Sequence, residues 1–276
     1  MRSATDPALL SRQLCPPNGV WRLVEVHDRL GSTNARAAEI GQPWSVVLSD
    51  HQTAGRGRLA RAWEAPPRTS VALSAVVPAP DVGLGWVPLL AGLAVAEAIR
   101  SFTGLTAVLK WPNDVLLPSD DHRKVCGVLC EYRAALGAEP VSTPAGGRAD
   151  RVVVGIGINQ AQSRGQLPVE TATSLVLAGA RTQVATDTTG LVTAVLSRLA
   201  AAVTAWQSGD PGRERLRAAY RAHSVTIGAD VALSLPGDRT VHGRALAVDD
   251  AGAVVVDSGA GPLAYPAGDV VHLRLG

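Results

Sequence analysis

The chain has 276 residues, of which 46% are hydrophobic, enough for one large packed domain and a small second one. Its formal net charge is only +2, without a long block of like charges, which argues against a general nucleic-acid binder. Three cysteines without C-x-x-C spacing, and an N-terminus without a secretory signal pattern, favour a reduced, cytoplasmic protein.

The first twenty residues form an N-terminal extension with little structure of their own. Ala8–Leu14 predicts one short helix, and the breaker cluster Pro16–Gly19 follows it. A helix-turn-helix domain needs at least two packed helices, so no DNA-reading domain is expected here.

A strand at Trp21–Val26 leads into the segment Gly31-Ser-Thr-Asn34. This segment predicts the start of a helix that reaches about Ile40, with Ser32 or Thr33 as the N-cap. The hydroxyls are either a plain cap or, with the free backbone N–H groups, part of a ligand site.

The loop His51–Trp63, between strands predicted at 45–48 and 70–77, is the most distinctive stretch of the chain. Glycine permits close approach of backbone to a ligand, and guanidinium groups bind phosphate or carboxylate oxygens in pairs. The loop is therefore either an anion-binding element or a solvated basic hairpin of the kind that contacts nucleic acid. Its glycines and arginines are Gly55, Gly57, Arg56, Arg58 and Arg61.

A core helix is predicted at Trp86–Phe102, which is too short and too interrupted by polar residues to span a bilayer. The next strand, Ala107–Lys110, breaks at Trp111-Pro-Asn-Asp114 because proline cannot donate a ladder hydrogen bond. Asn113 and Asp114 form either a local turn or, with Lys110, a site for a nucleotide phosphate and Mg²⁺.

Only Lys110 and Lys124 among the 26 basic residues are lysines. An ammonium is compact where a guanidinium is broad, so lysine suits a tight place beside a reacting oxygen. The alternative is chance clustering. Lys124 opens a strand that runs to Glu131, in which Gly127 marks a close approach of a ligand or another backbone.

The chain continues as an α+β pattern and ends in short strands. Arg151–Asn159 is a strand with Gly155 and Gly157, but it lacks the third glycine of a dinucleotide fingerprint. Alternating strands with Gly-rich turns after residue 223 predict a small β-barrel. The remaining predicted elements are a loop at 134–150, helices at Thr171–Ala178, Thr188–Ser208 and Gly212–His223, and strands at Val231–Leu235, Val241–Val248, Ala253–Val256 and Val270–Leu275.

Five motifs together carry a family resemblance that runs from about Trp21 to the end of the chain. In order and approximate spacing the sequence resembles the biotin–protein ligases through Gly31-Ser-Thr-Asn, Gln52-Thr-Ala-Gly-Arg-Gly-Arg, Lys110-Trp-Pro-Asn-Asp, Lys124-Val-Cys-Gly-Val-Leu and Gly155-Ile-Gly-Ile-Asn. The resemblance implies an α+β fold: a mixed β-sheet catalytic domain with helices packed on one side, followed by an SH3-like β-barrel. The domains are then 1–20, 21–223 and 224–276.

The resemblance also implies the reaction. Biotin and Mg-ATP give biotinyl-5′-adenylate, and a lysine on the biotin-carrier domain of an acetyl-CoA, acyl-CoA or pyruvate carboxylase then attacks it. Adenylation brings two anions together, so cations must neutralise them. The catalytic candidates are Lys124, Arg58 and Asp114, with Asp114 as a candidate Mg²⁺ ligand or as the proton acceptor for the incoming lysine.

Two binding sets follow from the same resemblance. The predicted biotin site consists of Ser32, Thr33, Asn34, Gln52, Gly55, Arg56, Arg58, Lys124, Gly127 and Gly155. The predicted ATP site consists of Arg58, Arg61, Trp63, Lys110, Asn113 and Asn159, with the Trp63 ring near the adenine.

The chain departs from the family pattern at Ala60, where glycine is usual, so a stiffer loop is expected. It also lacks the N-terminal winged helix of the family's repressors, so an enzyme without a DNA or membrane partner is predicted. The rivals are a lipoate–protein ligase of the same fold, a nucleic-acid-binding regulator, and a non-catalytic adaptor, which would leave both lysines unexplained.

Overall fold

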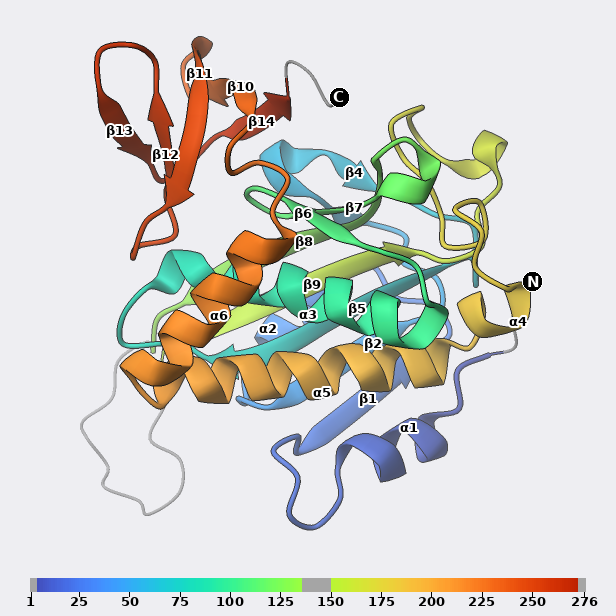
Figure 1. Cartoon of the computed structure of the whole chain (residues 1–276). Helices are drawn as coiled ribbons and strands as arrows, with labels where there is room; N and C mark the ends of the chain where they lie inside the picture. Colours follow the sequence, from blue (N-terminus) through green and yellow to red (C-terminus); the bar gives the residue numbers. More distant parts are fainter. Residues whose placement is uncertain (1–3, 136–149, 273–276) are drawn as a thin grey trace.

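A computed structural model describes residues 4–135 and 150–272 of the chain (Figure 1). The loop predicted at 134–150 therefore lies almost wholly outside the described residues. Within them, a seven-stranded sheet carries the helices and a five-stranded sheet follows at the C-terminal end.

The large sheet has the order β1-β2-β5-β9-β8-β7-β6. Only β1 and β2 are parallel, and every other neighbouring pair is antiparallel, so the predicted mixed sheet is confirmed. Its strands are β1 (Leu23–His27), β2 (Ser45–Ser49), β5 (Ser70–Pro78), β6 (Val108–Lys110), β7 (Asp114–Leu117), β8 (Arg123–Arg133) and β9 (Arg151–Asn159).

The helices cover the two faces of this sheet unequally (Figure 1). On β2, Val46 and Leu48 belong to the main core with α3 and α5, while the intervening Val47 packs with α2. The period of two in a strand produces this division. The predicted one-sided packing is confirmed for the main core, and of the helices in the described ranges only α2 packs on the opposite face. The helices are α1 (Pro7–Leu14), α2 (Thr33–Ile40), α3 (Val87–Thr103), α4 (Thr182–Ala185), α5 (Thr188–Gln207) and α6 (Asp210–His223).

Among the described residues two helical segments, Leu84–Thr103 and Thr188–Gln207, are long and apolar enough to cross a membrane by length and composition alone, so the prediction that the first is too short is wrong. In the structure α3 and α5 pack against each other on the sheet (Figure 1). Leu90 of α3 and Leu196 of α5 are both fully buried in the core. Burial against protein explains their apolar composition.

One predicted element is wrong. The stretch Thr171–Ala178 forms turns and an isolated bridge in place of a helix. Ala172 pairs with Lys124, and the Leu175 N–H donates to the Asn159 carbonyl at 3.0 Å. Its apolar residues Ala172, Leu175 and Ala178 are buried in this conformation, so their burial does not require a helix.

The C-terminal unit is an antiparallel sheet in the order β13-β12-β11-β10-β14, which confirms the predicted small β domain. The strand β13 was not among the predicted strands. The indoles of Trp111 and Trp86 donate to the Gly252 and Asp249 carbonyls at 3.1 and 2.9 Å, tying this unit to the large sheet. The strands are β10 (Asp230–Leu235), β11 (Arg239–Val248), β12 (Val254–Asp257), β13 (Pro262–Tyr265) and β14 (Asp269–His272).

Candidate functional site

The floor of the candidate site is a patch of the large sheet that lacks side chains. In the strand register Gly157 of β9 lies opposite both Gly127 of β8 and Ala72 of β5, and Gly155 lies opposite Ser74. Residues two apart on a strand share a face, and this face is the one that α2 covers. Small residues on three adjacent strands therefore let other side chains of the site lie directly against the sheet.

The N-terminus of α2 forms one wall of this patch. Ser32, one of the two predicted candidates, is the N-cap, and its hydroxyl accepts from the Ala35 N–H at 3.3 Å. The Thr33 N–H and hydroxyl both donate to Gln52 Oε1, at 2.9 and 3.0 Å. Ser74 Oγ lies 2.6 Å from Asn34 Oδ1. Three predicted biotin-site residues are thus joined in one hydrogen-bonded group.

The loop His51–Trp63, called the Gly-Arg loop below, lies over the floor. Its ends form a two-stranded ribbon, in which Gly55 pairs with Trp63 and Arg56 with Ala62. A Cβ at position 55 would overlap the Gln52 side chain, so glycine is needed there. The tip holds Leu59, exposed and with a φ of 54°. The loop is therefore an ordered flap beside the wall formed by α2.

Two buried donors without partners among the described residues face the floor. A Cβ at Gly155 would overlap the Asn34 amide, and one at Gly157 would overlap the Trp63 indole. Asn34 Nδ2 and Trp63 Nε1 are both buried and lack a hydrogen-bond partner. A buried unpaired donor costs about 1–3 kcal/mol, so a ligand that brings acceptors here gains that energy.

The two lysines lie at one end of the floor. Lys124 Nζ is 2.5 Å from Asp114 Oδ1, and a Cβ at Gly127 would lie 3.0 Å from the same Nζ. Lys110 pairs with Asp114 in the β6–β7 register. Burial lowers the pKa of Lys110, the Asp114 carboxylate opposes that shift, and the Lys124 ammonium adds to it. The result is a concentrated, partly buried positive charge beside one carboxylate.

The predicted ATP-site asparagines are engaged by the protein. Asn113 Nδ2 donates to the Val128 carbonyl at 2.8 Å, and its Oδ1 accepts from Arg58 at 3.4 Å. Asn159 is buried; its Nδ2 donates to the Thr173 carbonyl at 2.9 Å and its Oδ1 accepts from Gln162 at 2.8 Å. Asn159 therefore holds the 171–173 segment against β9.

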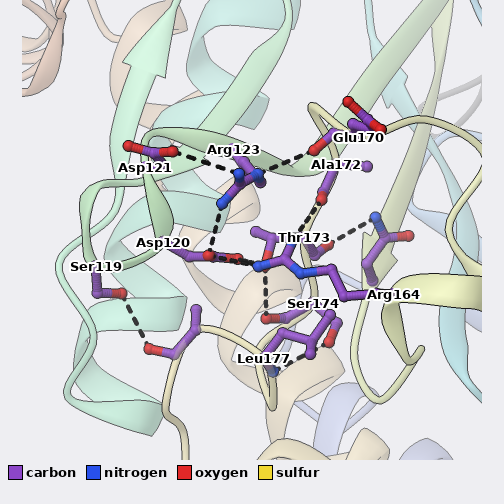
Figure 2. A network of polar contacts seen from close by, with 12 residues as sticks. Ser119, Asp120, Asp121, Arg123, Arg164, Glu170, Ala172, Thr173, Ser174 and Leu177 are labelled. Carbon is purple, nitrogen blue, oxygen red and sulfur yellow. Dashed lines mark hydrogen bonds and ion pairs between the residues drawn. The ribbon is translucent and has the colours of Figure 1, made fainter.

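Figure 2 shows a polar network around Asp120 that was not predicted from the sequence. The Asp120 carboxylate pairs with Arg123 at 2.9 Å and also with Arg164, and it accepts from the Thr173 hydroxyl. The Lys124 N–H donates to the Thr171 carbonyl, and Thr173 N–H donates to the Lys124 carbonyl, both at 2.8 Å. Asp120 thereby anchors the segment that holds the Lys124 backbone.

We expect Asp120→Asn to lower the free energy of unfolding by about 1–2 kcal/mol near pH 7. Burial would raise the pKa of Asp120, but bonds from Arg164 and Thr173 and the charges of Arg164 and Arg123 lower it on balance. Because the pKa of Asp120 is lower in the folded protein than its unfolded value of about 3.9, its charge stabilises the fold fully above that value. This stabilisation is lost as pH falls through the folded pKa. Urea unfolding of both proteins between about pH 3 and 7 should therefore show curves that converge at low pH.

The matched control is Asp121→Asn, because Asp121 is adjacent, 81% exposed and paired only at 3.3 Å with Arg123. It should change stability by less than about 0.5 kcal/mol. If the free energies of unfolding of the wild type and Asp120→Asn differed by the same amount at all pH values, the assigned role of the Asp120 charge would be contradicted.

The structure brings most of the predicted residues into one continuous site. Arg56 is exposed and has no ion pair within the described part of the chain. Arg58 and Arg61 turn toward the C-terminal sheet. Sequence reasoning omitted Gly157, although the alternation of Gly155 and Gly157 signals one face. It also missed Ser74, whose contact depends on the β5–β9 register.

A hollow of about 550 Å³ opens beside the Gly-Arg loop and extends the site outward. It is lined by polar and small residues of the loop and of the 166–168 segment, including His51, Gln52, Glu64 and Gln166. The hollow shares Gln52 with the hydrogen-bonded group at the N-terminus of α2.

Comparisons with known proteins agree on one family. Residues 29–159 match the biotin/lipoate A/B protein ligase family, and residues 226–273 match the biotin protein ligase C terminal domain. A biotin–[acetyl-CoA-carboxylase] ligase of Mycobacterium tuberculosis is 37% identical, over 99% of this chain and 98% of that protein. A bifunctional ligase/repressor of Bacillus subtilis is 30% identical, over 85% of this chain and 69% of that protein.

A solved structure shows the same architecture. The biotin protein ligase from Aquifex aeolicus in complex with biotin and ATP superimposes with a TM-score of 0.69 at 25% identity, covering 92% of this chain and 99% of that chain. Both sheets of the present fold therefore fall within the match.

Proposed function

The chain belongs to the biotin/lipoate A/B protein ligase family, and we infer that it is a biotin–protein ligase. It activates biotin with ATP as biotinyl-5′-adenylate and transfers the biotinyl group to a lysine of a carboxylase. The observation that carries this function is the whole-length similarity to a biotin–[acetyl-CoA-carboxylase] ligase, combined with a lysine at the end of a side-chain-free floor.

In the first half-reaction a biotin carboxylate oxygen attacks the α-phosphorus of ATP, and the bond to pyrophosphate breaks. Both reactants are anions, so the barrier is electrostatic. Lys124 lies beside Gly127 on the floor, where its ammonium attracts the carboxylate and the α-phosphate. Arg58 supplies a second cation from the Gly-Arg loop.

We place the biotin ring system on the glycine floor. Its ureido group has one carbonyl oxygen and two N–H groups, which need neutral donors and acceptors. Thr33, Gln52 and the unpaired Asn34 Nδ2 supply them on the wall formed by α2. Gly155 and Gly127 have no side chains there, and the exposed Arg56 remains a proposed member of this site.

We place the nucleotide beside the biotin site, at the lysine end of the floor, where Trp63 lies against Gly157 and offers its ring to the adenine. Lys110, Arg61 and Asn113 lie on the phosphate side. Asn159 acts through the Thr173 carbonyl that it holds. Mg²⁺ usually takes one or two carboxylates plus phosphate oxygens, and Asp114, which lies beside Lys124, would be one such ligand. There Mg²⁺ would neutralise charge on the leaving pyrophosphate.

In the second half-reaction the amine of a target lysine attacks the biotinyl carbonyl, and AMP leaves. The amine must first lose a proton, and Asp114 is the carboxylate placed beside Lys124 to accept it. We propose biotin-carrier domains of acetyl-CoA, acyl-CoA or pyruvate carboxylases as partners, and no DNA. Three free cysteines support a reducing, cytoplasmic setting.

Pyrophosphate–ATP exchange by the purified protein tests this function. We expect exchange that requires biotin, because adenylation is reversible and only a bound carboxylate completes the site. Parallel reactions contain lipoate or no acid. Exchange with lipoate alone would keep the fold and reaction but replace the substrate by the one used by the lipoate branch of the family. Absence of exchange with either acid would refute an adenylating enzyme.

A further inference from the structure

The beginning of β14 reaches from the C-terminal sheet to the Gly-Arg loop. Arg58 Nη1 lies 3.3 Å from Asp269 Oδ1, and Arg58 Nη2 donates to the Gly268 carbonyl at 3.0 Å. Arg61 Nη2 donates to the other carboxylate oxygen of Asp269 at 3.1 Å. One carboxylate of the C-terminal sheet therefore joins two arginines of the loop.

The backbone holds this carboxylate in place. Asp269 pairs with Ser234 in the β10–β14 register. Gly268 before it has a φ of 153°, and a Cβ there would lie 2.9 Å from the Ser234 carbonyl oxygen. Only glycine fits this entry into the strand. Asp269 and Arg58 are about three-quarters buried, with side chains 27% and 26% exposed, so solvent weakens their attraction less than at an open surface.

The same cations are the ones that the nucleotide needs. Asp269 raises the pKa of Lys110, as Asp114 does more strongly, while burial, the leading influence, lowers it. The Asp269 carboxylate thus adds a negative charge to the cluster formed by Arg58, Arg61 and Lys110. Guanidinium groups bind carboxylate and phosphate oxygens with the same paired geometry. A phosphate entering this cluster competes directly with the Asp269 carboxylate.

We propose that Asp269 is a positioning residue that serves as an internal counter-ion for the Gly-Arg loop. In the ligand-free protein it holds Arg58 and Arg61 on the C-terminal sheet. The phosphates of ATP replace it, which transfers the arginines from the sheet to the nucleotide. The second step rests on the proposed function, whereas the first concerns the ligand-free protein alone.

Limited trypsin digestion of the full, ligand-free chain tests the first step. Trypsin cleaves after Arg56, Arg58 and Arg61, and mass spectrometry identifies each cut. We expect Asp269→Asn to increase the cleavage rate of the loop roughly three- to ten-fold, because an unheld loop opens more often. Asp269→Glu retains the charge and should restore most of the protection. The matched control is Asp238→Asn, in the exposed β10–β11 turn of the same sheet.

Equilibrium binding of ATP without biotin tests the second step, because no reaction occurs. Removal of the competing charge should lower the Kd for ATP roughly three- to ten-fold in Asp269→Asn, with a thermal midpoint close to that of the wild type. Asp238→Asn should bind ATP as the wild type does.

Equal loop cleavage in Asp269→Asn and Asp238→Asn would overturn the counter-ion role in the ligand-free protein. Unchanged or weaker ATP binding by Asp269→Asn would overturn the displacement by phosphate. Failure of the wild-type protein to catalyse exchange would instead refute the proposed function, and the ligand-free digestion would still measure the Asp269 contact.

Discussion

Biotin-dependent pyrophosphate–ATP exchange should fall by about 10²–10³-fold when Lys124 is replaced by alanine, the range seen when one charge-stabilising group is lost. The Lys124 ammonium lies at the end of the glycine floor, 2.5 Å from Asp114. Its loss removes the cation between two reacting anions and leaves Asp114 to repel both. Exchange kinetics with radiolabelled pyrophosphate at saturating biotin and ATP measure the change in kcat.

Two further variants separate chemistry from folding. Lys124→Arg keeps the charge but places a broad guanidinium in the space beside Gly127, so we expect less than full rescue. The control is Arg133→Ala: Arg133 lies at the other end of β8 and its side chain is 47% exposed, so wild-type exchange is expected for this variant. Near-normal exchange in a folded Lys124→Ala protein would remove Lys124 from the first half-reaction.

Biotin use should be lost by at least about 100-fold in kcat/KM when Gly157 is replaced by valine, equivalent to nearly 3 kcal/mol. Even a Cβ at position 157 would overlap the Trp63 indole, and the valine methyl groups would fill the floor between Gly127 and Gly155. Overpacking itself costs about 1–3 kcal/mol of stability, so the chain should remain folded. Titration calorimetry with biotin, together with the exchange assay, measures the effect.

Gly165→Val is the matched control, because no atom lies within 4 Å of a Cβ placed there. It should leave both biotin affinity and exchange unchanged. If Gly157→Val binds biotin as tightly as the control does, the glycine floor is not the biotin site and the ring system binds elsewhere.

Much of the site was predictable because its signals are local. Ser32 and Thr33 are both predicted helix caps because a hydroxyl can satisfy a free N–H of the first turn, and in the structure Ser32 makes that bond. Period-two alternation predicted β9 with its glycines, and turn residues predicted the small C-terminal sheet. Caps, turns and strand periods depend on residues within a few positions, so sequence reports them directly.

The failures arise where distant segments meet. Thr171–Ala178 has apolar residues at helix-compatible spacing, yet bonds to Lys124 and Asn159 determine its conformation. Helical propensity is weak beside such tertiary contacts. The Asp120 network joins two loops that sequence reasoning treated as unrelated (Figure 2).

The family, the order of the five motifs and the residues that supply charge can be read from the amino-acid sequence, because each motif consists of neighbouring residues. The contacts of those charges depend on how the chain folds. Arg61 and Asp269 lie 208 residues apart and meet because β14 pairs with β10 beside the Gly-Arg loop. An ion pair requires atoms within a few ångströms, and packing between the two sheets, which no local pattern encodes, sets that distance.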